Sequence, residues 1–375
     1  MAAIRIVTLE GDQTGQELLE QALRVLDGDL LGLELELERF DLSLENRRAT
    51  NNGVCEQAAK AIRDCGLGLK APTITPEGAD DVGSPNRIIR EAIDGKVIVR
   101  TGRRIPGVTP VAGVHHPISV CRMAVGDAYG AKQWREDVDG DEAAYRTDAI
   151  RRSVCRAVAE YSFREAERLS GRVYGGPKWT VSPVYEGMLK EEIDAAAERH
   201  PEIAYEPVLI DATLAGLVSG AAVEPLVIPC LNRDGDLLSD LVLPLFGSIA
   251  GAESVLLGLD EDDRTSVCMA EAPHGTAPVL EGKDIANPMG MILAAAAVLH
   301  YADEVAASAD EVSDVAGRVA ELASRAIYEA VLEAVAAGVR TPDLGGSAGT
   351  TQFTDEVIGR VRNKFEAWSS LGTGS

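Results

Sequence analysis

Ile4-Arg-Ile-Val-Thr-Leu9 is a β-rich run that ends in Glu10-Gly-Asp-Gln-Thr-Gly15, after which leucines recur at helical spacing through Glu17–Leu26. This order predicts a strand, a turn and a helix. The turn holds two glycines but lacks the three-glycine dinucleotide fingerprint, so a plain strand-to-helix connection is the better interpretation. The first element of the chain is therefore typical of a layered α/β protein.

Alternating strand-like and helix-like segments continue outward from this unit and favour the same fold class. The next candidate segments are 33–40, 55–64, 67–74 and 85–93. Glycine, proline and short apolar runs from 97 to 131 predict a β-rich excursion, and the acidic stretch 137–141 predicts a loop. Beyond it we expect helices over 147–169, 185–198 and 312–337, and short buried strands at 208–210 and 226–228. Asn287 is the expected cap of a further helix that starts at Pro288.

The amino-acid composition limits the classes of function that the protein can have. Of the 375 residues 46% are hydrophobic and 26% charged, enough for one large or two ordinary domains. Lys plus Arg total 36 against 60 Asp plus Glu, a formal net charge of −24, which disfavours nucleic acid and anionic membranes as partners. The six cysteines show no CxxC pair, so neither a zinc ribbon nor a disulfide framework is suggested.

Targeting signals are not evident in the sequence. The N-terminus carries no basic segment followed by an apolar one, as a secretory signal would. The longest apolar stretch, Met289–Leu299, is too short to span a bilayer, which needs roughly 20 residues. We therefore expect a soluble, cytoplasmic protein.

Asn232-Arg-Asp-Gly-Asp-Leu-Leu-Ser-Asp240 is the sharpest candidate for chemistry. If the segment is helical, Asp236 and Asp240 project from one face and could bind a hard cation such as Mg²⁺, which needs only a few carboxylates. The alternative is an acidic first turn that complements the helix dipole. Asp211, after an apolar segment, is a third candidate ligand, with a loop cap as its alternative.

Several basic and aromatic residues are weaker candidates. Arg90, Arg100 and Arg122 each stand beside an apolar run, and converging guanidinium groups would bind a small polycarboxylate. Tyr129 could donate a proton, and Lys178 stands in Gly-Gly-Pro-Lys where a strand would end. Surface ion pairs, a buried tyrosine and a solvated lysine are the respective alternatives.

Two histidine-containing segments also carry candidate groups. The loop Ala270-Glu-Ala-Pro-His-Gly-Thr-Ala-Pro278 contains His274, although a histidine among prolines and glycines often only caps a turn. The pair His115-His116 is discarded as a metal site, because adjacent side chains in a strand point to opposite faces.

Together these segments resemble the isocitrate and isopropylmalate dehydrogenases, and the N-terminal half is most similar to homodimeric eukaryotic-type isocitrate dehydrogenases. The resemblance runs from about Ile4 to Thr354. Its motifs are Phe40-Asp-Leu-Ser-Leu-Glu-Asn-Arg-Arg-Ala-Thr50, Lys70-Ala-Pro-Thr-Ile-Thr-Pro76, Ser84-Pro-Asn-Arg-Ile-Ile-Arg90, the Asn232–Asp240 segment, His274-Gly-Thr-Ala-Pro278 and Ile285-Ala-Asn-Pro288. It implies a three-layer α/β fold with a discontinuous large domain of residues 1–96 and 248–375, and a small domain of residues 97–247. A shortened clasp at about 130–147 would contribute to the dimer.

The resemblance also implies a role for each matching residue. Tyr129 matches the general acid that protonates the enolate, and Lys178 matches the group that helps to deprotonate the substrate hydroxyl. Asp236 and Asp240 match metal ligands, while Asp211 and Lys178 match residues lent by the other subunit of a homodimer with shared sites. The positions that match substrate contacts are Thr75, Ser84, Asn86, Arg90, Arg100 and Arg122.

The implied cofactors are a nicotinamide nucleotide and Mg²⁺ or Mn²⁺. The positions that match nucleotide contacts are Lys70, Thr73, Thr75, His274, Gly275, Thr276, Val279, Leu280 and Asn287. Val279 and Leu280 stand where NADP-using relatives carry Arg and His, so no cation there neutralises a 2′-phosphate and NAD is favoured, with NADP as the alternative. The aspartate that NAD-using relatives place at Val279 is also missing.

The expected activity is therefore the oxidative decarboxylation of isocitrate to 2-oxoglutarate. Met123 and Val125 replace a histidine and a tyrosine of the resembling family beside the substrate. The same chemistry on an isocitrate analogue, homoisocitrate or a phosphonate, is the alternative. A non-catalytic regulatory subunit is a further alternative, weighed against the presence of every candidate catalytic and metal-binding group.

Overall fold

The computed structural model describes residues 3–77, 81–220, 222–308 and 314–371. A ten-stranded sheet runs through the molecule in the order β2-β1-β3-β12-β11-β4-β5-β10-β8-β9. The strands are β1 (Ile4–Glu10), β2 (Leu35–Asp41), β3 (Leu67–Lys70), β4 (Gly95–Gly102), β5 (Ile118–Met123), β8 (Arg172–Tyr174), β9 (Tyr205–Glu206), β10 (Leu226–Cys230), β11 (Ser254–Leu259) and β12 (Thr265–Glu271). The flanks are parallel, and the central ladders β12–β11, β11–β4 and β4–β5 are antiparallel.

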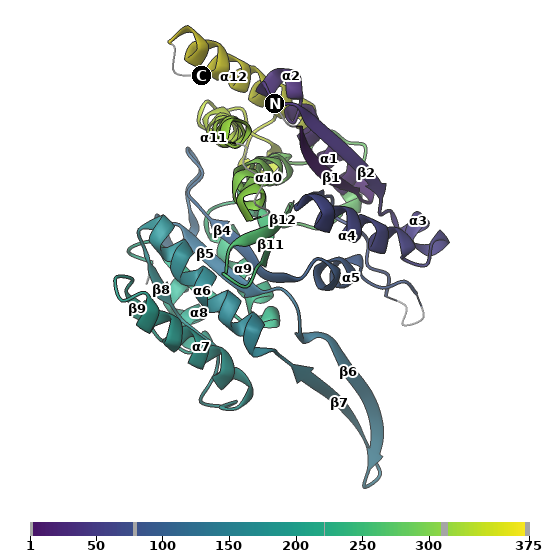
Figure 1. Cartoon of the computed structure of the whole chain (residues 1–375), viewed down its shortest axis with the longest axis vertical. Coiled ribbons are helices and arrows are strands. Elements are labelled where there is room, and N and C mark those ends of the chain that lie inside the picture. Colours follow the sequence, from purple (N-terminus) through teal and green to yellow (C-terminus); the bar gives the residue numbers. More distant parts are fainter. Residues whose placement is uncertain (1–2, 78–80, 221, 309–313, 372–375) are drawn as a thin grey trace.

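Helices cover both faces of the sheet (Figure 1). They are α1 (Gln13–Val25), α2 (Gly28–Leu31), α3 (Leu44–Ala49), α4 (Gly53–Cys65), α5 (Pro85–Ala92), α6 (Arg152–Leu169), α7 (Tyr185–Arg199), α8 (Ile210–Val218), α9 (Asn232–Leu245), α10 (Met289–Ser308), α11 (Asp314–Ala336) and α12 (Thr350–Ser370). Side chains of α1, α6, α7 and α10 share one hydrophobic cluster with the sheet, whereas α4 and α5, and separately α8 and α9, pack in two other clusters. The predicted three-layer α/β fold is confirmed. The expected domain boundaries at 96/97 and 247/248 stay a prediction.

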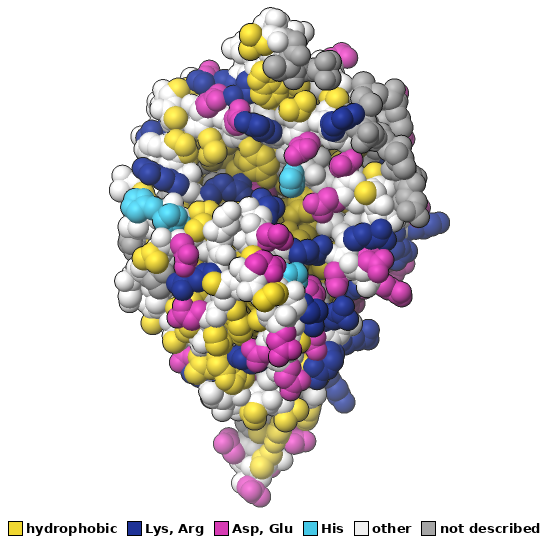
Figure 2. Space-filling view, turned by 60° about the vertical axis from the view of Figure 1, so that its left-hand side comes forward, with side chains coloured by type: hydrophobic (Ala, Val, Ile, Leu, Met, Phe, Trp, Pro, Cys, Tyr) yellow, Lys and Arg dark blue, Asp and Glu magenta, His cyan; other side chains and the backbone are white. Residues whose placement is uncertain are grey.

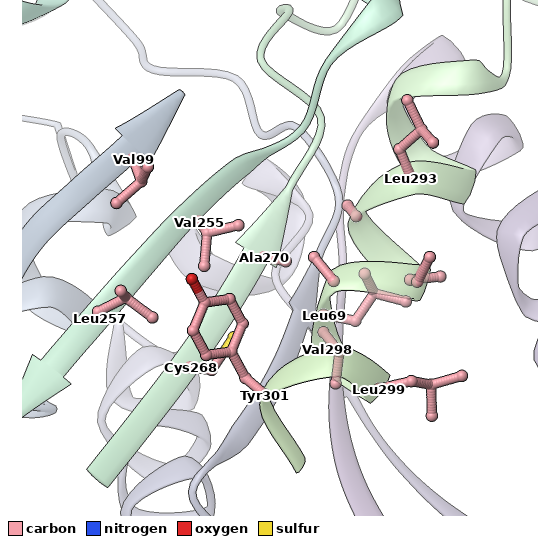
Figure 3. Packing of buried hydrophobic residues seen from close by; sticks show 14 of the residues in the cluster. Leu69, Val99, Val255, Leu257, Cys268, Ala270, Leu293, Val298, Leu299 and Tyr301 are labelled. Carbon is pink, nitrogen blue, oxygen red and sulfur yellow. The ribbon is translucent and has the colours of Figure 1, made fainter. Parts of the chain in front are cut away.

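Helix α10 lies at the centre of the largest cluster. The Asn287 side chain accepts a hydrogen bond from the Met289 amide at 3.0 Å, so the predicted cap is confirmed. Figure 3 shows side chains of this helix, among them Val298 and Tyr301, packed against the neighbouring strands. Its length and apolar composition would allow it to cross a membrane, but 78% of the relevant window is buried inside the molecule. It is therefore the core helix of the fold, and it continues beyond the predicted apolar stretch to Ser308.

Strands β6 (Asp127–Val138) and β7 (Asp141–Ala149) form a hairpin that projects from the body of the molecule (Figure 1). Asp139 and Gly140 make its turn with positive φ angles of 56° and 84°, which Asp-Gly favours. The predicted loop over 137–141 is therefore only two residues long. Trp134 and Tyr145 stack across the hairpin with ring centroids 5.1 Å apart.

Three sequence-based element bounds are wrong, each for a local reason. The helix expected from 147 begins at Arg152, because 147–149 complete the hairpin. The strand expected at 208–210 is replaced by β9 and α8, since Pro207 has no N–H for a strand ladder. The segment 67–74 is a strand only to Lys70. Of the predicted helix over 312–337, residues 312 and 313 lie outside the described residues.

Candidate active site

A cavity of about 650 Å³ opens between α5, the start of β6, α9 and the segment that follows β12. It gathers most of the residues that the sequence nominated for substrate, nucleotide, proton transfer and metal. The nominated residues that line it are Lys70, Thr73, Thr75, Ser84, Asn86, Arg90, Arg100, Arg122, Tyr129, Asp236, Asp240, His274 and Gly275. Segments up to about 200 residues apart in sequence therefore meet in one site.

Three arginines converge on this cavity from different elements. Arg90 lies in the last turn of α5, while Arg100 and Arg122 come from the adjacent antiparallel strands β4 and β5, and all three are buried. Arg100 donates to Ser254 Oγ at 3.1 Å and to Ser239 Oγ at 3.0 Å, contacts that hold its guanidinium in place. Burial, followed by the charge of Arg90, lowers the pKa of Arg122 to about 10, so it stays charged at neutral pH. Guanidinium groups that converge in this way are suited to binding carboxylates.

Asp236 and Asp240 lie one turn apart on α9, as predicted; Asp236 pairs with Arg100 and Arg122, and Asp240 pairs with Arg100. Asp236 accepts hydrogen bonds from Arg122 and from the Tyr129 hydroxyl, and Asp240 lies 3.2 Å from the Arg100 guanidinium. A Cβ on Gly235 would stand 2.6 Å from the Arg122 Cβ, so glycine is what lets α9 approach β5. Burial raises the pKa of Asp240, a cost that a bound cation would offset.

Tyr129 lies in an irregular part of β6, where the hairpin register shifts between Asp127 and Lys132. The irregularity turns its ring beneath the Arg122 guanidinium, 5.2 Å from the ring centroid, and its hydroxyl toward Asp236. Burial and the hydrogen bond to Asp236 raise the pKa of Tyr129. The phenol therefore stays protonated at neutral pH and can act as a proton donor.

Glu271 is a member of this site that the sequence analysis missed. It ends β12 opposite Lys70 of β3, accepts a hydrogen bond from the Lys70 ammonium at 2.9 Å and lies 3.6 Å from the Arg90 guanidinium. Burial alone would raise the pKa of Glu271, but Lys70 and Arg90 lower it to about 2. A sequence signal existed, because an acidic residue ends an apolar segment just before His274.

Lys178 and Asp211 lie away from the cavity and bind each other. The Lys178 ammonium donates to Asp211, and this contact lowers the pKa of the Asp211 carboxyl. Both side chains reach the surface, with 30% and 63% of the side chain exposed. Within one chain they therefore take no part in the site that holds Asp236, Asp240 and Tyr129.

The nominated nucleotide contacts are only partly brought together. His274 and Gly275 line the cavity, whereas Thr276, Val279, Leu280 and Asn287 do not. Val279 is 71% exposed in a short 3₁₀ turn, Pro278–Leu280. Asn287 uses its side chain to cap α10 and to donate to Asp343 at 2.9 Å.

A family model described as isocitrate/isopropylmalate dehydrogenase matches residues 5–357. The chain belongs to the isocitrate/isopropylmalate dehydrogenase family. It is 29% identical over 94% of its length to an NADP isocitrate dehydrogenase of Thermus thermophilus, of which it covers 67%. It is also 29% identical over 92% of its length to the mitochondrial NAD isocitrate dehydrogenase catalytic subunit 5 of Arabidopsis thaliana, of which it covers 86%. A 3-isopropylmalate dehydrogenase of Novosphingobium aromaticivorans is 27% identical over 96% of this chain and 100% of its own.

Solved structures of the family confirm the fold. The isocitrate dehydrogenase of Methylococcus capsulatus superposes with a TM-score of 0.80 at 24% identity, over 96% of this chain and 99% of that one. Members of the isocitrate/isopropylmalate dehydrogenase family are oxidative decarboxylating dehydrogenases that use NAD or NADP with Mg²⁺ or Mn²⁺. The chain is therefore an oxidoreductase of this class.

The donor atoms in the cavity fit the cofactors of the family. Thr73 Oγ1, Asn86 Oδ1 and His274 Nε2 are buried without a hydrogen-bond partner in the described part of the chain, as expected of groups that meet a ligand. His274 Nδ1 lies 3.0 Å from the Gly275 carbonyl, so it carries the proton and leaves Nε2 as an acceptor. For a divalent cation, Asp236 and Asp240 offer two carboxylates, and the described residues contain no group of three His, Cys, Asp or Glu side chains suited to a metal. A hard cation would thus need a further ligand from substrate or from another chain.

Proposed function

We propose that this chain oxidatively decarboxylates isocitrate to 2-oxoglutarate and CO₂, with NAD as the oxidant and Mg²⁺ or Mn²⁺ as the metal. The observation that supports this most strongly is one cavity lined by three buried arginines, a protonated tyrosine and two aspartates on one helix face. Arg90, Arg100 and Arg122 supply three positive charges for a small polycarboxylate. Ser84, Asn86 and Thr75 line the same cavity and would supply polar contacts to a further carboxylate of the substrate.

Each step of the reaction has a residue to serve it. A divalent cation held by Asp236 and Asp240 would polarise the hydroxyl group and stabilise the negative charge that develops on its oxygen. A bound nicotinamide would supply the hydride acceptor, and Lys178 of the partner subunit would take the hydroxyl proton. The β-carboxylate then leaves as CO₂, its bonding electrons form the enolate, and Tyr129 protonates the carbon.

We further propose a cytoplasmic homodimer in which Lys178 and Asp211 serve the site of the partner subunit. Large apolar side chains are exposed on the segments that carry Lys178 and Asp211 and on α9. They are Val181 at 74%, Val184 at 86%, Val218 at 58% and Leu237 at 63% exposed. Figure 2 shows acidic and basic side chains interspersed over the face it presents, with hydrophobic side chains also at the surface toward the hairpin. A surface of this kind suits a second copy of the chain better than nucleic acid or a membrane.

The preference for NAD rests on the turn that carries Val279 and Leu280. Neither side chain can neutralise a 2′-phosphate. The Glu17 carboxylate accepts a hydrogen bond from the Gly282 amide at 2.7 Å, which adds negative charge beside this turn. A phosphate dianion would be repelled there, while ribose hydroxyls would not.

An isocitrate analogue is the second candidate substrate, since Val125 lines the cavity where the resembling enzymes carry a tyrosine. Steady-state kinetics with isocitrate, homoisocitrate, isopropylmalate and the phosphonate analogue, each with NAD and NADP and with or without EDTA, distinguish the candidates. We expect chelator-sensitive oxidation of isocitrate with a higher kcat/KM for NAD. No turnover across the whole panel would contradict the proposal and favour a regulatory subunit.

The shared site has its own test, in which two inactive variants are mixed. Lys178→Met and Asp236→Asn should each abolish turnover as homodimers. In a mixed dimer both defects fall in one site and the other site is intact, so random reassociation should restore about a quarter of the wild-type activity. Mixed dimers that form but stay inactive would contradict the exchange of Lys178 between subunits.

A further inference from the structure

Arg87 is a cation of the cavity that neither the reaction nor the sequence analysis uses. It is the third residue of α5, between the polar residues Ser84 and Asn86 on one side and Arg90 one turn further on. Its side chain lines the cavity together with those three residues. A positive charge therefore stands at the end of the site where neutral polar groups otherwise meet the substrate.

The aliphatic part of the Arg87 side chain lies close to the neighbouring strand β6. Gly130, which follows Tyr129 in β6, has a φ of 80°, and a Cβ there would stand 3.1 Å from the Arg87 Cδ. Glycine at this position thus leaves the space in which the aliphatic part of Arg87 lies. The contact links the residue to the strand that carries the proposed proton donor.

The charge of Arg87 is weakly compensated in comparison with the other arginines of the cavity. Arg90, Arg100 and Arg122 are buried and face Glu271, Asp240 and Asp236. Arg87 has Glu91 at 3.6 Å, one turn along the same helix, and both side chains are more than half exposed. Exposed pairs of this kind are weak and leave most of the charge available to a ligand.

Ser84, Asn86 and Arg87 together match a tetrahedral anion better than a planar one. A carboxylate has two oxygens and one charge, which the two neutral side chains can satisfy by hydrogen bonds alone. A phosphonate has three oxygens and up to two charges, and an arginine fork binds two such oxygens at once. A phosphonate therefore accounts for the presence of Arg87, which adds a third hydrogen-bond donor and a positive charge beside Ser84 and Asn86.

We propose that Arg87 is a specificity-determining residue that makes the site prefer a substrate in which the γ-carboxylate of isocitrate is replaced by a phosphonate. The inference rests on the proposed function, because the oxidation and the loss of CO₂ are the same. The hydride still passes to NAD, the β-carboxylate still leaves as CO₂, and the γ-phosphonate takes no part in bond making or breaking.

The test compares the wild-type enzyme with Arg87→Gln and Arg87→Lys on isocitrate, homoisocitrate and the phosphonate analogue. We expect the wild type to have its highest kcat/KM with the phosphonate. Arg87→Gln should lower that value about 10- to 100-fold, mainly through KM, and change the value for isocitrate less than about threefold. Arg87→Lys should recover part of the loss.

The pH profile separates charge recognition from a structural effect. The second ionisation of an alkylphosphonate falls at a pH of about 7 to 8, above the value of about 6 for a phosphate ester. In the wild type the ratio of kcat/KM for phosphonate over isocitrate should rise through this range, and in Arg87→Gln the rise should be lost. Arg325→Gln is the matched control, since Arg325 forms the same i,i+4 pair with Glu329 on α11, outside this cavity, and it should change neither ratio.

Two outcomes would overturn the assignment and leave the proposed function standing. One is a wild-type preference for isocitrate or homoisocitrate over the phosphonate. The other is an equal loss on all substrates in Arg87→Gln with an unchanged pH profile. Absence of turnover on every substrate would instead contradict the proposed function itself.

Discussion

Replacement of Glu271 by glutamine tests the charge arrangement beneath the cavity. The carboxylate accepts a hydrogen bond from Lys70, whose side chain is 1% exposed, and lies 3.6 Å from Arg90. Glu271→Gln keeps the shape of the side chain but removes the negative charge between these two cations. Two buried positive charges are then left without a counter-ion, which is a strongly destabilising arrangement.

The expected cost follows from the pKa of Glu271, which lies at about 2 compared with the ordinary glutamate value of 4.5. A difference of this size corresponds to about 3 kcal/mol in the free energy of unfolding. Because the folded-state pKa is lowered, this stabilisation is fully present above about pH 4.5 and is lost as the pH falls through the folded value of about 2. Glu271→Gln should therefore be about 3 kcal/mol less stable than wild type at pH 7, and the gap should shrink to less than half of that at pH 3.

Urea unfolding at pH 7 and at pH 3, with one fixed protein concentration, measures the difference in the free energy of unfolding between wild type and Glu271→Gln. Glu356→Gln is a suitable control, because Glu356 pairs with Arg360 on the surface of α12 and should cost less than about 0.5 kcal/mol at either pH. The reasoning would be refuted if the free energy of unfolding of Glu271→Gln lay within 1 kcal/mol of the wild-type value at pH 7, or if the difference between the two proteins did not change with pH. The KM values for NAD and substrate should also rise, since Lys70 and Arg90 line the cavity.

Three further substitutions address catalysis, cofactor and assembly. Tyr129→Phe should lower kcat by about 10²- to 10⁴-fold with little change in KM, and a loss of less than tenfold in steady-state assays would remove Tyr129 from the role of acid. Val279→Asp should lower the KM for NAD and raise the KM for NADP, because the added carboxylate accepts hydrogen bonds from ribose hydroxyls but repels a 2′-phosphate. An unchanged NAD/NADP ratio of kcat/KM would place the adenosine ribose elsewhere. Leu237→Asp puts a charge at an exposed leucine of α9 and should shift the protein to monomers in sedimentation velocity, whereas a stable, active dimer would show that Leu237 is not in the interface.

The helical spacing of residues in the sequence predicted the part of the site that depends only on local secondary structure. The spacing of Asp236 and Asp240 requires only that the segment be helical, and α9 is helical from Asn232 to Leu245. The polar Ser84 and the following Pro85 form a helix start that can be recognised in sequence, and Ser84 Oγ accepts from the Asn86 amide at 3.3 Å. Helical spacing was sufficient for the two aspartates, whereas Ser84 was nominated by the resemblance to the family.

Glu271 and Arg47 could not be found in this way, because their partners are distant in sequence. Glu271 meets Lys70 only through the parallel register of β12 and β3, 201 residues apart. Arg47 is fully buried and donates to the carbonyl groups of Leu42, Ile74 and Gly83. It thereby fixes the segments just before Thr75 and Ser84, yet an arginine near a helix end is normally predicted to be solvated.

The exchange of Lys178 and Asp211 between subunits that we propose cannot be seen in a single chain. Both side chains are partly exposed, and ion pairs at a protein surface contribute about 0 to 1 kcal/mol. Because the Lys178–Asp211 contact contributes so little free energy, either side chain can exchange its partner when a second chain approaches. A divalent cation held by Asp236 and Asp240 would attract the Asp211 carboxylate of the partner subunit more strongly than one lysine does, since it has twice the charge. That exchange would in turn free the Lys178 amine to accept the substrate proton, so assembly of the dimer and activation of the base would be one event.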